Sequence, residues 1–69
     1  MRQVLVYTDE DGAWCASCPS LSGCHSQGET REEALANIKE TIQLWIDDAI
    51  DHGEPIPPDT YEMVSLDIR

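Results

Sequence analysis

Three cysteines and one histidine lie in the first half of the chain, at spacings that suit metal binding or nucleophilic catalysis. Two residues separate Cys15 from Cys18, which is the spacing of half a zinc site, and Cys24 is adjacent to His25. On β-strands, however, side chains three apart and side chains next to each other point to opposite faces. We therefore expect no metal site and no cofactor, and we interpret the cysteines as small buried thiols. A nucleophile–base pair of Cys24 and His25 is disfavoured for the same reason.

A second set of residues with possible chemistry is the acidic run Asp9-Glu10-Asp11. A metal-assisted nuclease needs several carboxylates that converge on one site. This run is followed by Gly12, and Asp-Gly is a strong hairpin signal, so we interpret it as a solvated turn. We expect no catalytic residue in this chain. A small nuclease that uses Asp9 and Asp11 is the less favoured alternative.

A third set, Asp47, Asp48 and Asp51, lies near the end of a predicted helix, and Glu54 follows it. Negative charges at a helix C-terminus oppose the helix dipole and repel one another. Violations of a local rule occur preferentially at functional sites. We therefore expect partner binding at these four acids and at Leu44, an apolar residue in the middle of the polar helix face. The alternative is a solvated acidic face that only keeps the protein soluble.

The helix that carries these acids has clear start and stop signals. Thr30 is a good N-cap, and Glu33 completes a capping box with it. Gly53 is a natural residue to follow the helix end, and the prolines from Pro55 onward prevent continuation. Apolar residues at helical spacing predict a core-facing stripe, which consists of Ala34, Leu35, Ile38, Ile42, Trp45, Ile46 and Ala49.

Alternating or β-branched runs predict strands at residues 3–8, 13–18, 24–27 and 61–68. Gly28 is expected to form a bend with positive φ. The predicted fold is one α+β domain over residues 1–69, in the order β-β-β-α-β, with an antiparallel sheet and one long helix on one of its faces. The first strand is apolar on both faces, which indicates cover on both sides or an oligomer.

Length and charge restrict the classes of partner. A chain of 69 residues hides only about 60% of its unfolded surface and is marginally stable alone, so we expect a homodimer or tetramer. The net charge of −10 repels phosphate and favours a basic protein partner over nucleic acid. We find neither a signal peptide nor an apolar run of the about 20 residues that cross a membrane, so we expect a cytosolic protein with reduced thiols.

The run from Pro19 to Thr30, together with Glu32-Glu33-Ala34-Leu35 and the later Asp51-His52-Gly53-Glu54-Pro55, resembles the HicB antitoxin family. The structural motif that carries this resemblance comprises Gly23, Cys24, Gly28, Thr30, Glu33, Ala34 and Gly53. The resemblance implies a partial ribonuclease-H-like fold. It also implies that the chain binds a HicA toxin, a small basic ribonuclease that cleaves mRNA with the help of a histidine, and covers the toxin's active site.

The chain departs from the family pattern in one respect. Many HicB proteins carry a C-terminal DNA-binding module, whereas this sequence ends at Arg69, directly after the predicted fourth strand. We therefore expect no binding to an operator. The alternative to an antitoxin is a self-associating structural or regulatory module without catalytic activity.

Overall fold

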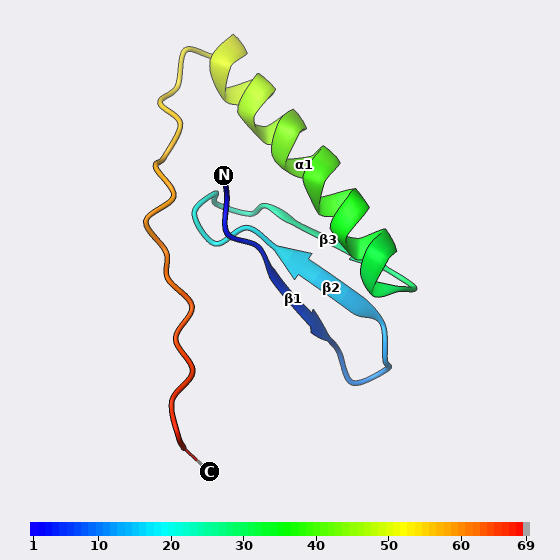
Figure 1. Cartoon of the computed structure of the whole chain (residues 1–69). Helices are drawn as coiled ribbons and strands as arrows, with labels where there is room; N and C mark the ends of the chain where they lie inside the picture. The colour runs from blue at the N-terminus through cyan, green and yellow to red at the C-terminus, as the bar shows by residue number, and fades with distance from the viewer. Residues whose placement is uncertain (69) are drawn as a thin grey trace.

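The fold is a three-stranded antiparallel sheet with one long helix across one face (Figure 1). A computed structural model describes residues 1–68. Strands β1 (Leu5–Thr8), β2 (Trp14–Ser17) and β3 (His25–Gly28) pair in the order β1-β2-β3, and helix α1 (Arg31–Asp51) follows. This arrangement confirms the predicted α+β class. No helix in the described residues combines the length and the apolar character needed to cross a bilayer.

The strand register divides the sheet into two unlike faces. Val6 pairs with Ala16, which pairs with Ser26, and because side chains alternate these residues point toward α1. The other face has no helix on it, and we call it the open face. It is formed by Leu5, Tyr7, Cys15, Ser17, His25 and Gln27.

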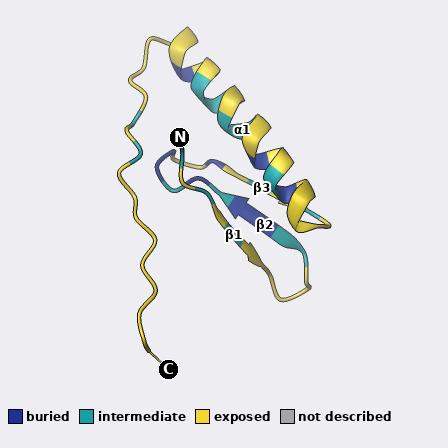
Figure 2. Cartoon of the chain, in the orientation of Figure 1, coloured by how far each residue is buried: buried dark blue, intermediate teal, exposed yellow. Residues whose placement is uncertain are grey.

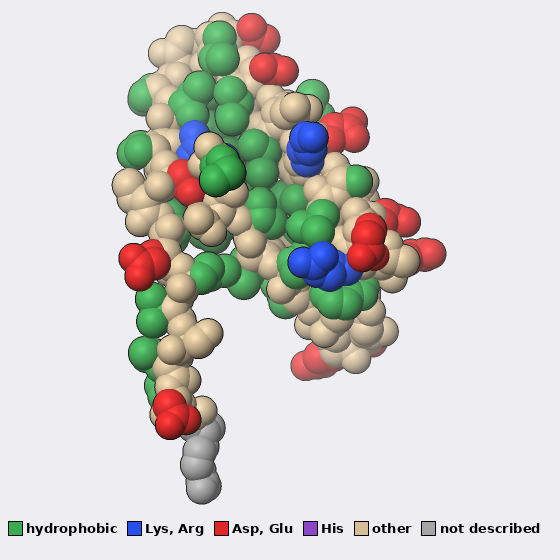
Figure 3. Space-filling view, in the orientation of Figure 1, with side chains coloured by type: hydrophobic (Ala, Val, Ile, Leu, Met, Phe, Trp, Pro, Cys, Tyr) green, Lys and Arg blue, Asp and Glu red, His purple; other side chains and the backbone are tan. Residues whose placement is uncertain are grey.

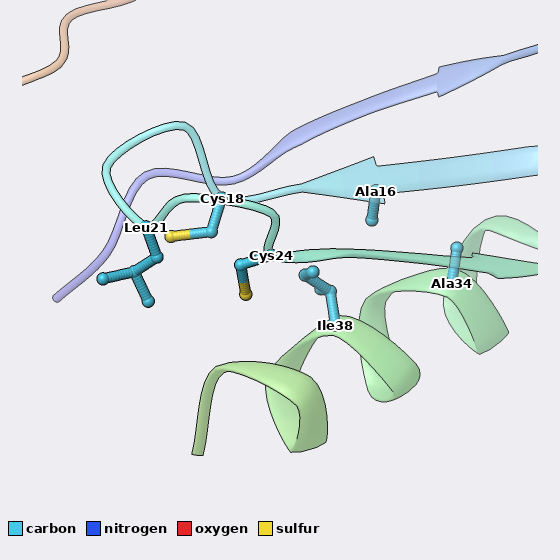
Figure 4. Close-up of a cluster of buried hydrophobic side chains, with 6 residues drawn as sticks. All are labelled: Ala16, Cys18, Leu21, Cys24, Ala34 and Ile38. Carbon is cyan, nitrogen blue, oxygen red and sulfur yellow. The ribbon is translucent and has the colours of Figure 1, made fainter. Parts of the chain in front are cut away.

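The core lies between the sheet and α1, as Figure 4 shows. Its fully buried members are Ala16, Cys18, Leu21, Cys24, Ala34 and Ile38. Half-buried apolar residues from β1, β2 and the second half of α1 surround this cluster. The predicted helix stripe is confirmed, because all seven of its residues are buried or half-buried while most of the remaining helix surface is exposed (Figure 2).

Both helix ends lie where the sequence predicted, although one bond of the predicted capping box differs. The Thr30 hydroxyl accepts a hydrogen bond from the Glu33 amide over 3.1 Å. The Glu33 carboxylate accepts one from the Glu29 amide over 3.2 Å, one residue earlier than in the standard capping box. At the other end Gly53 has φ of 67°, and the amides of Gly53 and Glu54 donate to carbonyls of the last turn. This is a Schellman motif, which satisfies the terminal carbonyls.

The expected positive φ at Gly28 is wrong. The residue is required there because α1 begins directly against it. A Cβ atom at Gly28 would lie 2.5 Å from the Ala34 amide nitrogen and 2.9 Å from the Glu33 carbonyl carbon. Close approach of two backbone segments therefore explains this glycine.

The predicted fourth strand does not form: within residues 1–68, segment 61–68 pairs with no strand. Figure 1 shows it as an extended chain that leaves the sheet. Its alternating pattern favours a strand. A strand also needs a neighbouring strand to pair with and cover for its apolar side chains. The fold of one copy leaves the β1 edge open and has no second layer over the open face.

Candidate functional site: an acidic ridge on the helix

The exposed side of α1 carries a row of residues at helical spacing. Leu44, Asp47, Asp48 and Asp51 occupy positions i, i+3, i+4 and i+7, so they share one face of the helix. All four are exposed, and Glu54 follows just beyond the helix end. We call these five residues the acidic ridge. Figure 3 shows acidic side chains at this end of the molecule.

Helix length places the acidic ridge beyond the strands. The 21 residues of α1 span about 31 Å, whereas a strand of four residues spans about 13 Å. The second half of α1 lies instead over the loop that joins β2 to β3. There the indole Nε1 of Trp45 donates to the Ser22 carbonyl over 2.9 Å. This bond fixes which side of the helix faces inward and leaves the acidic ridge in solvent.

The carboxylates of the acidic ridge have little compensation from the rest of the chain. The last turn of α1 contains no basic residue. Within residues 1–68 the one ion pair joins His52 Nδ1 to Asp48 Oδ1 at 3.4 Å, and it requires a protonated histidine. The same ring nitrogen lies 2.8 Å from the Asp48 carbonyl oxygen. The negative charges of Asp47, Asp51 and Glu54 are thus available to a basic partner.

The cysteines and the histidine are separated as expected. Cys18 and Cys24 are buried on the helix side of the sheet, Cys15 belongs to the open face, and His25 is exposed there. Among the described residues, no three His, Cys, Asp or Glu side chains come together in an arrangement that could hold a metal ion.

Cys24 has the properties of a core residue. Burial, and secondarily the nearby Cys18 thiol, raise the pKa of the Cys24 thiol above its ordinary value of 9.0. A raised pKa disfavours the thiolate, which is the nucleophilic form. We therefore assign Cys24 a packing role beside Ile38 and Leu21.

In the acidic turn, the Asp9 carboxylate already accepts hydrogen bonds from the turn's own backbone. Asp9 Oδ1 accepts hydrogen bonds from the Asp11 and Ala13 amides, each at 2.9 Å, and these bonds shape the hairpin. Asp11, Glu29 and Glu33 line an open hollow of about 420 Å³ at the start of α1. This hollow lies at the opposite end of the helix from the acidic ridge.

The residues that carried the family resemblance build the junction between sheet and helix. Gly23 has φ of 71° in the loop before β3, Cys24 and Ala34 are buried, and Gly28 admits the first turn of α1. Thr30, Glu33 and Gly53 form the helix ends. None of the seven belongs to the acidic ridge, so the motif describes the fold and leaves the binding surface to other residues.

Sequence reasoning missed one set of contacts. Arg2 Nη1 donates to the Pro57 carbonyl over 2.6 Å and to the Ser20 hydroxyl over 3.1 Å. The Gln3 amide donates to Asp59 Oδ2 over 2.9 Å. The bonds to Pro57 and Asp59 join positions more than 50 residues apart, and no local pattern signals them. They attach the segment after α1 to the start of the chain.

Comparison with known proteins adds an independent finding. The family model described as a HicB-like antitoxin of bacterial toxin–antitoxin systems matches residues 3–67. A UPF0150 protein of Thermoplasma acidophilum is 43% identical over 63 residues, which cover 91% of each chain. A UPF0150 protein of Synechocystis is 45% identical over 65 residues, covering 94% of this chain and 82% of the relative. No solved structure matches the chain.

Proposed function

Because this chain belongs to the HicB-like antitoxin family of bacterial toxin–antitoxin systems, we propose that it binds a small basic toxin of the HicA type and covers the toxin's active site. Family membership indicates a toxin partner and a binding role in place of a catalytic one. The acidic ridge supports a basic toxin of the HicA type as that partner. Its carboxylates are exposed and mostly lack cationic partners in the described chain.

The chemistry of the acidic ridge fits a basic ribonuclease. The net charge of −10 attracts a basic protein over long range and accelerates their encounter. At short range the carboxylates accept hydrogen bonds from arginine and lysine, and charge-assisted bonds of this kind are the stronger ones. Leu44, 63% exposed at the N-terminal end of the ridge, supplies an apolar contact that water leaves when the partner docks.

The same charge argues against direct binding to RNA or DNA, because a polyanion repels a chain of charge −10. The proposed toxin acts on mRNA, so the proposal places both proteins in the cytosol. In that reducing compartment the three cysteines, which form no disulfide in the structure, stay free thiols.

The test begins with the gene next to the one that encodes this chain, which we expect to encode a short basic HicA-type protein. The purified toxin should bind this chain and lose its mRNA-cleaving activity. The double variant Asp47→Lys/Asp48→Lys should associate at least about tenfold more slowly at low salt, and the difference should shrink as salt screens the charges.

A matched control separates the acidic ridge from total charge. Glu10→Lys/Glu32→Lys makes the same change in net charge at two exposed positions outside the ridge. We expect this control to slow association much less than the ridge variant does. Equal slowing by both variants, or full inhibition by the ridge variant at the parent's rate, would show that the ridge is not the contact surface.

A further inference from the structure

The segment Tyr61–Ile68, which we call the C-terminal segment, carries five exposed large apolar side chains in eight residues. Its large apolar side chains are between 54% and 77% exposed, and they are Tyr61, Met63, Val64, Leu66 and Ile68. Figure 3 shows hydrophobic side chains along this part of the molecule. Single exposed apolar residues are ordinary, whereas a run of this kind marks an interaction site.

Hydrogen bonds hold the residues just before this segment close to the β1 edge of the sheet. Pro57 is bonded to Arg2, and Asp59 to Gln3, immediately before β1 begins. Because β2 is the only partner of β1 among the described strands, the other edge of β1 is open. An open edge presents unpaired backbone donors and acceptors to any available strand. The C-terminal segment nevertheless runs past its own β1 without pairing (Figure 1).

The side chains of the segment show why one copy cannot stabilise it as a strand. Along an extended chain, Val64, Leu66 and Ile68 lie on one face, and Tyr61 and Met63 on the other. A strand that is apolar on both faces is stable when both faces are covered. In one copy α1 covers a single face of the sheet, and the open face leaves Leu5 39% and Tyr7 46% exposed.

Charge identifies which partner could supply the missing cover. This chain has 14 acidic residues, and two such chains repel each other over most of their surface. None of the acidic residues belongs to the open face, and β1 itself is uncharged. A neutral, partly apolar sheet face beside an open edge is therefore the surface on which a second copy can approach.

We propose that two copies of this chain exchange their C-terminal segments, so that Tyr61–Ile68 of each copy pairs as a fourth strand with the β1 edge of the other. The exchange is reciprocal, closes with twofold symmetry and removes both open β1 edges. It also completes the β-β-β-α-β order with a strand from the second copy. The acidic ridge lies on the outer side of α1 and stays free to bind a toxin.

Two measurements on the full chain test this proposal. Light scattering after size-exclusion chromatography should give twice the 7.7 kDa mass of one chain. In a refolded mixture of ¹³C-labelled and unlabelled copies, isotope-filtered NMR should show contacts from the Val64 and Leu66 methyl groups to one face of β1 in the other copy, either to Val6 on the helix side or to Leu5 and Tyr7 on the open face. A monomeric mass, or contacts that arise within one copy, would overturn the exchange.

Variants provide a third test. Val64→Lys/Leu66→Lys should be monomeric at concentrations at least tenfold above those at which the parent is dimeric. Its circular dichroism should keep the helix signal, since neither residue belongs to the core. The control Ala36→Lys/Gln43→Lys makes the same charge change at two exposed helix positions and should stay dimeric. A dimeric Val64→Lys/Leu66→Lys variant, or a monomeric control, would contradict strand exchange. Loss of toxin binding by ridge variants would leave these results unchanged.

Discussion

The indole nitrogen of Trp45 and the carbonyl oxygen of Ser22 are joined by a hydrogen bond of 2.9 Å. This bond attaches the second half of α1, which extends beyond the short strands, to the loop between β2 and β3. The loop contributes Leu21, one of the largest fully buried side chains, to the core below. The position of the acidic ridge therefore depends on a contact between the inner side of the helix and a loop.

Replacing Trp45 with Phe should destabilise the fold. The variant keeps an aromatic ring but removes the donor, so the Ser22 carbonyl loses its partner at a cost of about 1 kcal/mol. Trp14→Phe is the matched control, because it removes a similar ring area from a half-buried indole of the same sheet–helix layer. Urea unfolding should show that Trp45→Phe costs about 1 kcal/mol more than Trp14→Phe. Equal losses would mean that the hydrogen bond contributes nothing measurable.

Gly28→Ala should separate the start of α1 from β3. The added methyl group would meet the Ala34 nitrogen at 2.5 Å, and backbone atoms cannot move aside as a flexible side chain can. Overpacking of this kind costs about 1–3 kcal/mol. Gly12→Ala is the comparison, since φ of 83° makes it strained in an open space. We expect the larger loss of unfolding free energy at Gly28; a larger loss at Gly12 would show that the close approach relaxes easily.

Asp51→Asn should raise stability and weaken partner binding. Removing one charge from the last turn relieves its conflict with the helix dipole, which is worth about 0.3–1 kcal/mol. Glu32→Gln, in the first turn where an acid is favourable, should lower stability by a similar amount. Chemical unfolding of the two variants measures both signs. If Asp51→Asn is less stable than the parent, the acidic ridge does not carry the energetic cost that we attribute to it.

The parts of this fold that could be predicted are those with local causes. Thr30, Glu33 and Gly53 act on backbone groups within a few residues, and a helical stripe is visible in any window of two turns. The lack of pairing by segment 61–68 within one copy could not be predicted, because alternation favours a strand without specifying an edge that receives it. Gly28 shows the same limit: the sequence signals a glycine, and the nearby helix backbone supplies the reason.

The candidate site was predictable in its composition and only partly in its geometry. Asp47, Asp48 and Asp51 were recognisable because they contradict the helix dipole. Leu44 belongs to the candidate site because helical spacing places it on the same exposed face as these acids. The bonds from Arg2 to Pro57 and from Gln3 to Asp59 escaped prediction because each connects residues at opposite ends of the sequence.

Cys24 should make stability depend on alkaline pH. Its pKa is raised in the folded chain, first by burial and then by Cys18, whereas in the unfolded chain the thiol ionises near its ordinary value of 9.0. Above that pH the unfolded chain releases a proton that the folded chain retains, so the unfolding free energy falls as pH rises toward the folded pKa. Urea unfolding from about pH 8 to about pH 10 should therefore show a steeper fall for the parent than for Cys24→Ala. Ile38→Val also weakens the core but keeps the thiol, so it should show the parent's slope. The parent, Cys24→Ala and Ile38→Val could instead all show the same slope. In that case other groups cause the loss of unfolding free energy at alkaline pH, and burial of the Cys24 thiol does not contribute to it.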